Sequence, residues 1–245
     1  NHLRCRHGYL AGTDAQRTAD LNRAMGDPGL DAIVFARGGY GCGRILDDLD
    51  FSPLKSRPKI FLGYSDLTAF YAALFRATGI AGFYGPMVLN FNRPGKEFRE
   101  RSLWSVLERR PGWNRFRLSR RGVLREGRGE GKLVGGCLSL LVSLLGTRYD
   151  LDTRGAILFW EEVDEEPYRI DRMLNQLRMA GKFRDLEGMV VGRLEGCAPK
   201  GRTPGLPLRE ILSGHLRDAR FPVLLDFPAG HAPGKLTLPL GLPAR

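Results

Sequence analysis

Three residue types in this 245-residue sequence could together form a nucleophilic site: a serine, a histidine and a carboxylate. Ser65 lies in KIFLGYSDLTAFYAALF, where an apolar strand-like segment turns through GYSD into a helix-like segment. Such a turn projects a hydroxyl from the edge of a sheet and leaves the N–H of the next residue, Asp66, facing an oxyanion. Serine is also a favoured helix N-cap, and the second glycine of Gly-x-Ser-x-Gly is absent here. Ser65 is therefore a candidate nucleophile or a helix cap.

A serine nucleophile needs a base, and the sequence offers four histidines. His2 and His7 lie close to the N-terminus, and His215 belongs to LREILSGHLRDAR, which is typical of an amphipathic surface helix. His231 lies in the loop PAGHAPGK between two strand-like segments, where a rigid scaffold can position a side chain. His231 is therefore the candidate base, although it could also be an ordinary loop histidine.

The third requirement is a carboxylate that orients the histidine, and AILFWEE places Glu161 and Glu162 directly after a strand-like run. Successive strand residues point to opposite sides of a sheet, so only one of the two can face the site. Alternatively, this acidic turn only favours the N-terminus of the helix that begins near Pro167. The sequence has no HExxH and no paired Cys/His spacing, so we expect no metal site.

The glycine-dense stretch RGGYGCG, residues 37–43, raises the question of a nucleotide cofactor. Its spacing fits neither Gly-x-Gly-x-x-Gly nor a P-loop, so no cofactor is predicted. The pattern instead indicates a strand-to-helix turn whose backbone N–H groups can point at a ligand.

Strand-like and helix-like segments alternate in the first half of the chain. Apolar runs at 31–36, 60–63 and 79–85 predict strands, and a capping box that begins at Thr13 predicts a helix. The fold class is therefore α/β, with a doubly wound N-terminal α/β domain over 1–111. A connection over 112–132 leads to a smaller mixed α/β domain over 133–245, with a helix from Pro167 that Gly181 ends and strands at AILFW, MVVGRL, VLLDF and LTLPL.

Composition indicates which classes of partner and which cellular compartment to expect. The net charge of +11 would suit nucleic acid, but no nucleic-acid motif accompanies the basic residues, so none is expected as a partner. The sequence has no apolar run of the roughly 20 residues that a membrane helix needs, so no membrane association is expected. Four well-separated cysteines without a CxxC pair suit a reducing cytoplasm. Because the sequence opens at Asn1, we expect it to be a trimmed form of a longer product.

Several stretches together resemble the LD-carboxypeptidases, cytoplasmic serine peptidases that include the microcin immunity peptidases. The similar stretches occur in family order over nearly the whole chain: GYLAGTDAQR, DAIVFARGGYGCGRILDDLD, KIFLGYSDLTA, YGPM, GGCLSLLVSLLGT, ILFWEEVDEEPYRIDRMLNQL, VGRLEGC and GHAPGKLTLPLG. The combination of RGGYG, GYSD and PYRIDRML is specific to this family.

The resemblance implies a catalytic triad of Ser65, Glu161 and His231. Glu161 is preferred to Glu162 because it is the first acid after the apolar strand. The resemblance also implies an oxyanion hole formed by the N–H groups of Gly39 and Asp66. It further implies a homodimer without cofactors that cleaves the L,D amide bond of cytoplasmic murein tetrapeptides and releases the terminal D-alanine during cell-wall recycling.

Two residues depart from the family pattern, and we expect the family's first strand, upstream of GYLAGTD, to be absent or degraded. Cys137 stands where the family has asparagine, and Lys235 stands where asparagine is frequent. Arg37 or Arg169 could bind a substrate carboxylate. Three alternatives stay open: an immunity-type peptidase acting on a peptide-nucleotide antibiotic, an α/β-hydrolase esterase with the same triad order, and an inactive binding homologue.

Overall fold

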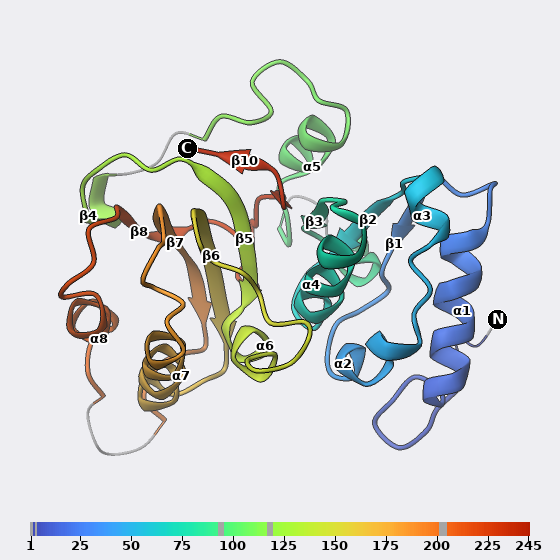
Figure 1. The fold of residues 1–245 in the computed structure, drawn as a ribbon, viewed down its shortest axis with the longest axis horizontal. Helices are drawn as coiled ribbons and strands as arrows, with labels where there is room; N and C mark the ends of the chain where they lie inside the picture. Colours follow the sequence, from blue (N-terminus) through green and yellow to red (C-terminus); the bar gives the residue numbers. More distant parts are fainter. Residues whose placement is uncertain (1, 3, 93–95, 117–119, 201–204) are drawn as a thin grey trace.

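The computed structural model describes residues 2, 4–92, 96–116, 120–200 and 205–245, and it confirms the α/β class. Its strands form two sheets, which lie beside each other in Figure 1. The first has the strand order β1-β2-β3-β9 and the second the order β10-β5-β6-β7-β8-β4. No helix among the described residues is both long and apolar enough to cross a membrane.

Three parallel strands and one antiparallel strand make up the first sheet. The parallel strands are β1 (Ala32–Val34), β2 (Ile60–Gly63) and β3 (Gly82–Tyr84), and β9 (Leu238–Leu240) pairs with β3 in the antiparallel direction. The helical segments around this sheet are α1 (Asp14–Gly26), α2 (Cys42–Ile45), η1 (Leu46–Asp48), α3 (Pro53–Ser56), α4 (Leu67–Thr78), η2 (Val88–Asn92) and α5 (Glu100–Leu107).

Local signals explain where two of these helices begin and end. The Thr13 hydroxyl accepts from the Gln16 N–H at 3.2 Å, and the Gln16 side chain accepts from the Thr13 N–H at 2.9 Å, so the predicted capping box is confirmed at the start of α1. The helix α4 ends at Gly79, whose φ of 72° favours glycine.

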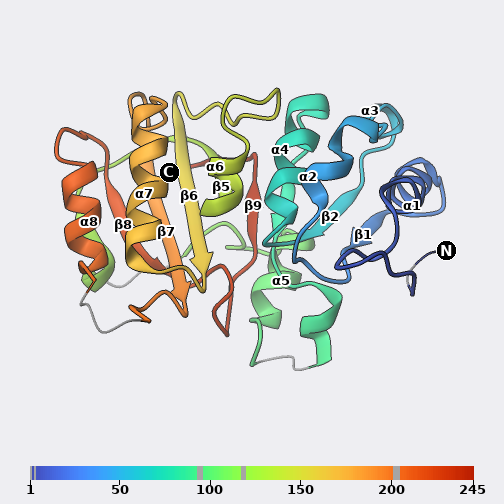
Figure 2. The ribbon, with the colours of Figure 1, turned by 90° about the horizontal axis from the view of Figure 1, so that it is seen from below.

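The second sheet has a parallel centre and antiparallel edges. Strands β5 (Gly131–Cys137), β6 (Ala156–Val163), β7 (Gly188–Glu195) and β8 (Val223–Phe227) run parallel, while β4 (Val123–Arg125) and β10 (Pro243–Ala244) are antiparallel edges. Helices α6 (Leu138–Ser143), α7 (Pro167–Met179) and α8 (Leu208–His215) cover one face, as Figures 1 and 2 show. The remaining element is η3 (Arg120–Gly122).

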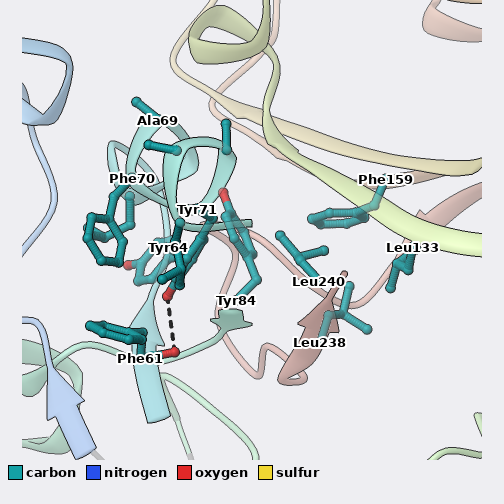
Figure 3. Close-up of a cluster of buried hydrophobic side chains, with 14 of the residues drawn as sticks. Phe61, Tyr64, Ala69, Phe70, Tyr71, Tyr84, Leu133, Phe159, Leu238 and Leu240 are labelled. Atoms are coloured by element: carbon teal, nitrogen blue, oxygen red, sulfur yellow. Dashed lines mark hydrogen bonds between the residues drawn. The ribbon is translucent and has the colours of Figure 1, made fainter. Parts of the chain in front are cut away.

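One apolar cluster joins the two sheets. It contains Phe61, Tyr84 and Leu240 of the first sheet and Leu133 and Phe159 of the second. Figure 3 shows Tyr84 between Tyr71 of α4 and Phe159 of β6. Burial of this shared cluster holds the sheets together.

The division into domains 1–111 and 133–245 stays a prediction. One strand from the C-terminal part of the chain, β9, completes the first sheet, so the chain crosses back at its end. Within the predicted connection 112–132, β4 pairs with β8 and β5 begins at Gly131, while residues 117–119 lie outside the described residues.

Candidate active site

Ser65 lies in the sharp turn between β2 and α4. It is one of four non-glycine residues described with a positive φ, here 67°, a conformation that costs roughly 1–2 kcal/mol for a residue with a Cβ. The N-cap of α4 is the next residue, Asp66, so Ser65 is not the helix cap. The strained turn instead leaves the Ser65 hydroxyl free to bond residues outside the turn and outside α4.

The hydroxyl of Ser65 meets His231, which the loop between β8 and β9 carries. The Nε2 atom of His231 lies 3.0 Å from the Ser65 Oγ, and the Nδ1 atom lies 2.7 Å from the Oε2 of Glu161. The imidazole also packs edge-on against Tyr64, with ring centroids 4.9 Å apart. The structure therefore brings together the three residues that the sequence nominated, from segments 70 and 166 residues away from His231.

The two adjacent glutamates of β6 have different hydrogen-bond partners. Glu161 is fully buried, and its Oε2 accepts from both the Nδ1 and the backbone N–H of His231. Glu162 points to the other side of the strand, where it accepts from the Ser139 N–H at 2.7 Å and from the Val163 N–H at 2.9 Å. Glu162 thus stabilises the beginning of α6 and does not bond His231.

Glycines allow the chain to come close to Glu161. A Cβ at Gly230 would lie 2.5 Å from the Glu161 Oε2, and a Cβ at Gly192 would lie 2.7 Å from the Glu161 Cβ. Any larger residue would displace the carboxylate, so these glycines are part of how the site is built.

The RGGYG turn lies against Ser65. A Cβ at Gly38 would come within 2.9 Å of the Ser65 Cβ, and the Cys42 N–H donates to the Asp66 Oδ2 at 2.8 Å, which ties the turn to the serine. Among the described residues, the N–H groups of Gly39 and Asp66 have no hydrogen-bond partner. Both are therefore free to donate to a ligand, as their predicted oxyanion role requires.

Sequence reasoning missed Tyr84, the last residue of β3. Its hydroxyl accepts from the Ser65 N–H at 3.1 Å and donates to the Glu161 Oε1 at 2.6 Å. Burial raises the pKa of Tyr84 well above its usual value, so the hydroxyl keeps its proton and remains a donor. A tyrosine at a strand end carries no signal of this role, because the contact depends on how the two sheets meet.

The two departures from the family pattern adjoin the site. The Cys137 Sγ lies 3.3 Å from the Glu162 Oε1, and burial raises the pKa of this thiol far above its usual range, so it is a neutral thiol. Lys235 is also buried. Its Nζ donates to the Glu97 carbonyl at 3.0 Å and lies 5.0 Å from the centroid of the Tyr64 ring, which itself packs on His231.

The two arginines considered for a substrate carboxylate are both exposed. Arg37 belongs to the RGGYG turn, whereas Arg169 on α7 donates to Glu165 at 3.5 Å. An assignment of either to the substrate stays a prediction.

Two family models match the chain. The LD-carboxypeptidase N-terminal domain matches residues 1–85, and the LD-carboxypeptidase C-terminal domain matches residues 130–245. Both models describe the same family, and together they cover most of the chain.

Individual proteins agree with these models. A Bacillus subtilis protein named "Probable murein peptide carboxypeptidase" is 42% identical over 99% of this chain and 76% of its own length. The crystal structure of muramoyltetrapeptide carboxypeptidase from Oxalobacter formigenes superposes with a TM-score of 0.83 at 31% identity, covering 98% of this chain and 82% of that one. The Microcin C7 self-immunity protein MccF of Escherichia coli is 28% identical over 96% of this chain and 76% of its own length. The chain therefore belongs to the LD-carboxypeptidase family of hydrolases.

Proposed function

We propose that this protein is a serine carboxypeptidase that cleaves the L,D amide bond before the terminal D-alanine of murein tetrapeptides. The observation that carries the proposal is the continuous hydrogen-bonded series from the Ser65 hydroxyl through His231 to the buried Glu161. Membership of the family and the names of two relatives support the substrate class.

The chemistry follows from the order of these contacts. His231 takes the Ser65 proton as the Oγ attacks the scissile carbonyl, and Glu161 holds the imidazole and stabilises its cation. The N–H groups of Gly39 and Asp66 receive the oxyanion. His231 then donates its proton to the departing amine of D-alanine, and water hydrolyses the acyl-enzyme.

The compartment and the partners are part of the proposal. Murein tetrapeptides released during cell-wall recycling are cytoplasmic, so we place the protein there. Their free carboxylates suit a chain with a net charge of +11. We further propose a homodimer, without a cofactor or a nucleic-acid partner.

An immunity-type peptidase is the second candidate, and one observation favours it. Tyr40, next to Gly39, is 63% exposed and packs against the exposed Tyr9, with ring centroids 5.7 Å apart. Exposed aromatic rings beside the oxyanion turn would stack on a nucleobase. A peptide joined to a nucleotide through an acyl linkage is therefore the competing substrate.

A fluorophosphonate probe separates an enzyme from an inactive binding homologue. We expect the probe to label the wild-type protein, and labelling to vanish in Ser65→Ala, because the probe reacts only with an activated serine. Unreacted protein from the same preparation is then given a murein tetrapeptide and a peptidyl nucleotide in parallel, because the probe occupies the Ser65 Oγ of every molecule that it labels. Faster cleavage of the peptidyl nucleotide would replace the first candidate with the second, and a folded protein without labelling would contradict both.

A further inference from the structure

Tyr84 contacts two members of the candidate triad at once, although it comes from neither of their segments. It ends β3, whereas Ser65 follows β2 and Glu161 lies on β6 of the other sheet. A single hydroxyl accepts from the Ser65 N–H and donates to the Glu161 Oε1. It is therefore a direct link between the nucleophile's backbone and the acid.

The Tyr84 ring is held from both sheets. It packs edge-on against Tyr64, which follows β2, and against Tyr71 of α4, with centroids 6.2 and 6.5 Å apart, and against Phe159 of β6 at 5.5 Å. Phe159 and Glu161 are two residues apart on β6 and so share one face of the strand. The side chain, only 1% exposed, has little freedom to move its hydroxyl away from Glu161 (Figure 3).

Glu161 depends on these donors because its side chain is not exposed to bulk solvent. The carboxylate is fully buried, and its described hydrogen bonds come from the two nitrogens of His231 and from Tyr84. The two His231 bonds share Oε2, so Tyr84 alone holds Oε1 among the described residues. A buried carboxylate oxygen without a donor is costly and would rotate or shift to find one.

The Tyr84 hydroxyl also has a second role, which follows from the strained backbone of Ser65. A serine with a φ of 67° remains in that conformation only where its surroundings fix it. The bond from its N–H to Tyr84 holds the Ser65 backbone, while the Oγ contacts His231.

We propose that Tyr84 is a positioning residue. Its hydroxyl holds the Glu161 carboxylate and the backbone of the Ser65 turn at a fixed position relative to each other. It acts through these residues, because its side chain is buried and its hydroxyl bonds the Ser65 N–H and the Glu161 carboxylate. This inference rests on the proposed function, since it assumes that Ser65 and Glu161 do chemistry.

The test compares Tyr84→Phe with Tyr71→Phe. Tyr71 is the matched control because it is a buried neighbour whose hydroxyl donates to the carbonyls of Gly63 and Phe83 and not to the triad. We expect Tyr84→Phe to lower kcat for the tetrapeptide about 10- to 100-fold with little change in KM, because a hydrogen bond to a charged group is lost. Tyr71→Phe should keep kcat within about threefold, with a comparable loss of melting temperature.

A double-mutant cycle asks whether Tyr84 acts through Glu161. The rate of probe labelling at Ser65 is measured for the wild type, Tyr84→Phe, Glu161→Gln and the double variant. We expect Tyr84→Phe to slow labelling by a smaller factor in the Glu161→Gln background than in the wild type, because the hydroxyl then has no carboxylate to hold and only its bond to the Ser65 N–H remains to be lost.

Three results would overturn the inference: equal kcat values for the two tyrosine variants, additive effects in the cycle, or an unfolded Tyr84→Phe beside a folded Tyr71→Phe. The last would assign the hydroxyl to folding alone. A wild type that labels at Ser65 but does not cleave the tetrapeptide would contradict the proposed function and not this inference, because the labelling rates still compare the variants.

Discussion

At the residue scale, the two neighbouring glutamates of β6 have different roles in the structure. Glu161 bonds His231, while Glu162 accepts from the Ser139 N–H at the start of α6. The alternation of side chains along a strand predicts that only one acid faces the histidine. Pattern alone leaves open which one, and the surroundings of each residue favour Glu161.

Substitution of each glutamate by alanine tests this assignment. Glu161→Ala should lower kcat/KM by about 10³- to 10⁴-fold, because the imidazole loses its orienting group and its counter-charge. Glu162→Ala should keep activity within about tenfold and lower the free energy of unfolding by roughly 1–2 kcal/mol, the usual cost of a lost helix N-terminal acceptor. Steady-state kinetics and urea unfolding check both, and a reversed pattern would make Glu162 the acid.

The backbone of Ser65 allows a second test at the same scale. Ser65→Gly and Ser65→Ala both remove the hydroxyl, but only glycine adopts a φ of 67° without steric cost. The glycine variant should therefore be more stable than the alanine variant by about 1–2 kcal/mol. Equal stabilities in thermal and urea unfolding would argue that the turn is not strained.

At the element scale, the RGGYG turn and the serine turn pack as one unit. A Cβ at Gly38 would meet the Ser65 Cβ, whereas a Cβ at Gly43 in α2 would meet nothing within 4 Å. Sequence reasoning recognised a glycine turn able to approach a ligand. It could not show that the turn also packs against Ser65, because that contact depends on two loops meeting at the end of the sheet.

Alanine should lower activity at Gly38 and leave activity unchanged at Gly43. Gly38→Ala should lower kcat/KM at least about tenfold, because the clash pushes Ser65 away from His231 and small displacements of reacting groups are costly. Gly43→Ala should leave activity unchanged and stabilise the chain by about 0.5–1 kcal/mol, since alanine is the better helix former. Full activity in Gly38→Ala would contradict the close packing that this turn requires.

At the scale of the whole molecule, the two sheets share a core and a returning strand. Several helices and most strands follow from local signals such as the Thr13 capping box and Gly79, whereas α3 and α5 were not predicted. The pairing of β9 with β3 and the hydrogen bonds of Tyr84 do not follow from local signals. Tertiary packing determines that β9 returns to the first sheet and that the two sheets make contact, and no pattern within one segment shows either.

At this scale, burial of Lys235 predicts how the stability of the fold depends on pH. Lys235 lies shortly before β9, the strand that completes the first sheet. Burial lowers the pKa of Lys235 from 10.5, so the folded chain releases this proton at a lower pH than the unfolded chain. Between the lowered pKa and 10.5 the unfolded state binds more protons, and this residue therefore makes stability rise with pH.

Lys235→Met removes that contribution. The free energy of unfolding of the wild type minus that of the variant should rise as pH increases through this interval and be constant below it. Urea unfolding at a series of pH values gives the difference, in which the titration of other groups cancels. A difference that falls as pH increases would reverse the sign and contradict the effect of burial.

The most direct test of the account is release of D-alanine from a murein tetrapeptide by the wild type, Ser65→Ala and Glu161→Ala, followed by mass spectrometry. We predict tripeptide from the wild type, none above background from Ser65→Ala, a trace from Glu161→Ala, and no cleavage of the same peptide ending in L-alanine. Equal release by Ser65→Ala would show that the serine is not the nucleophile and would contradict the central claim.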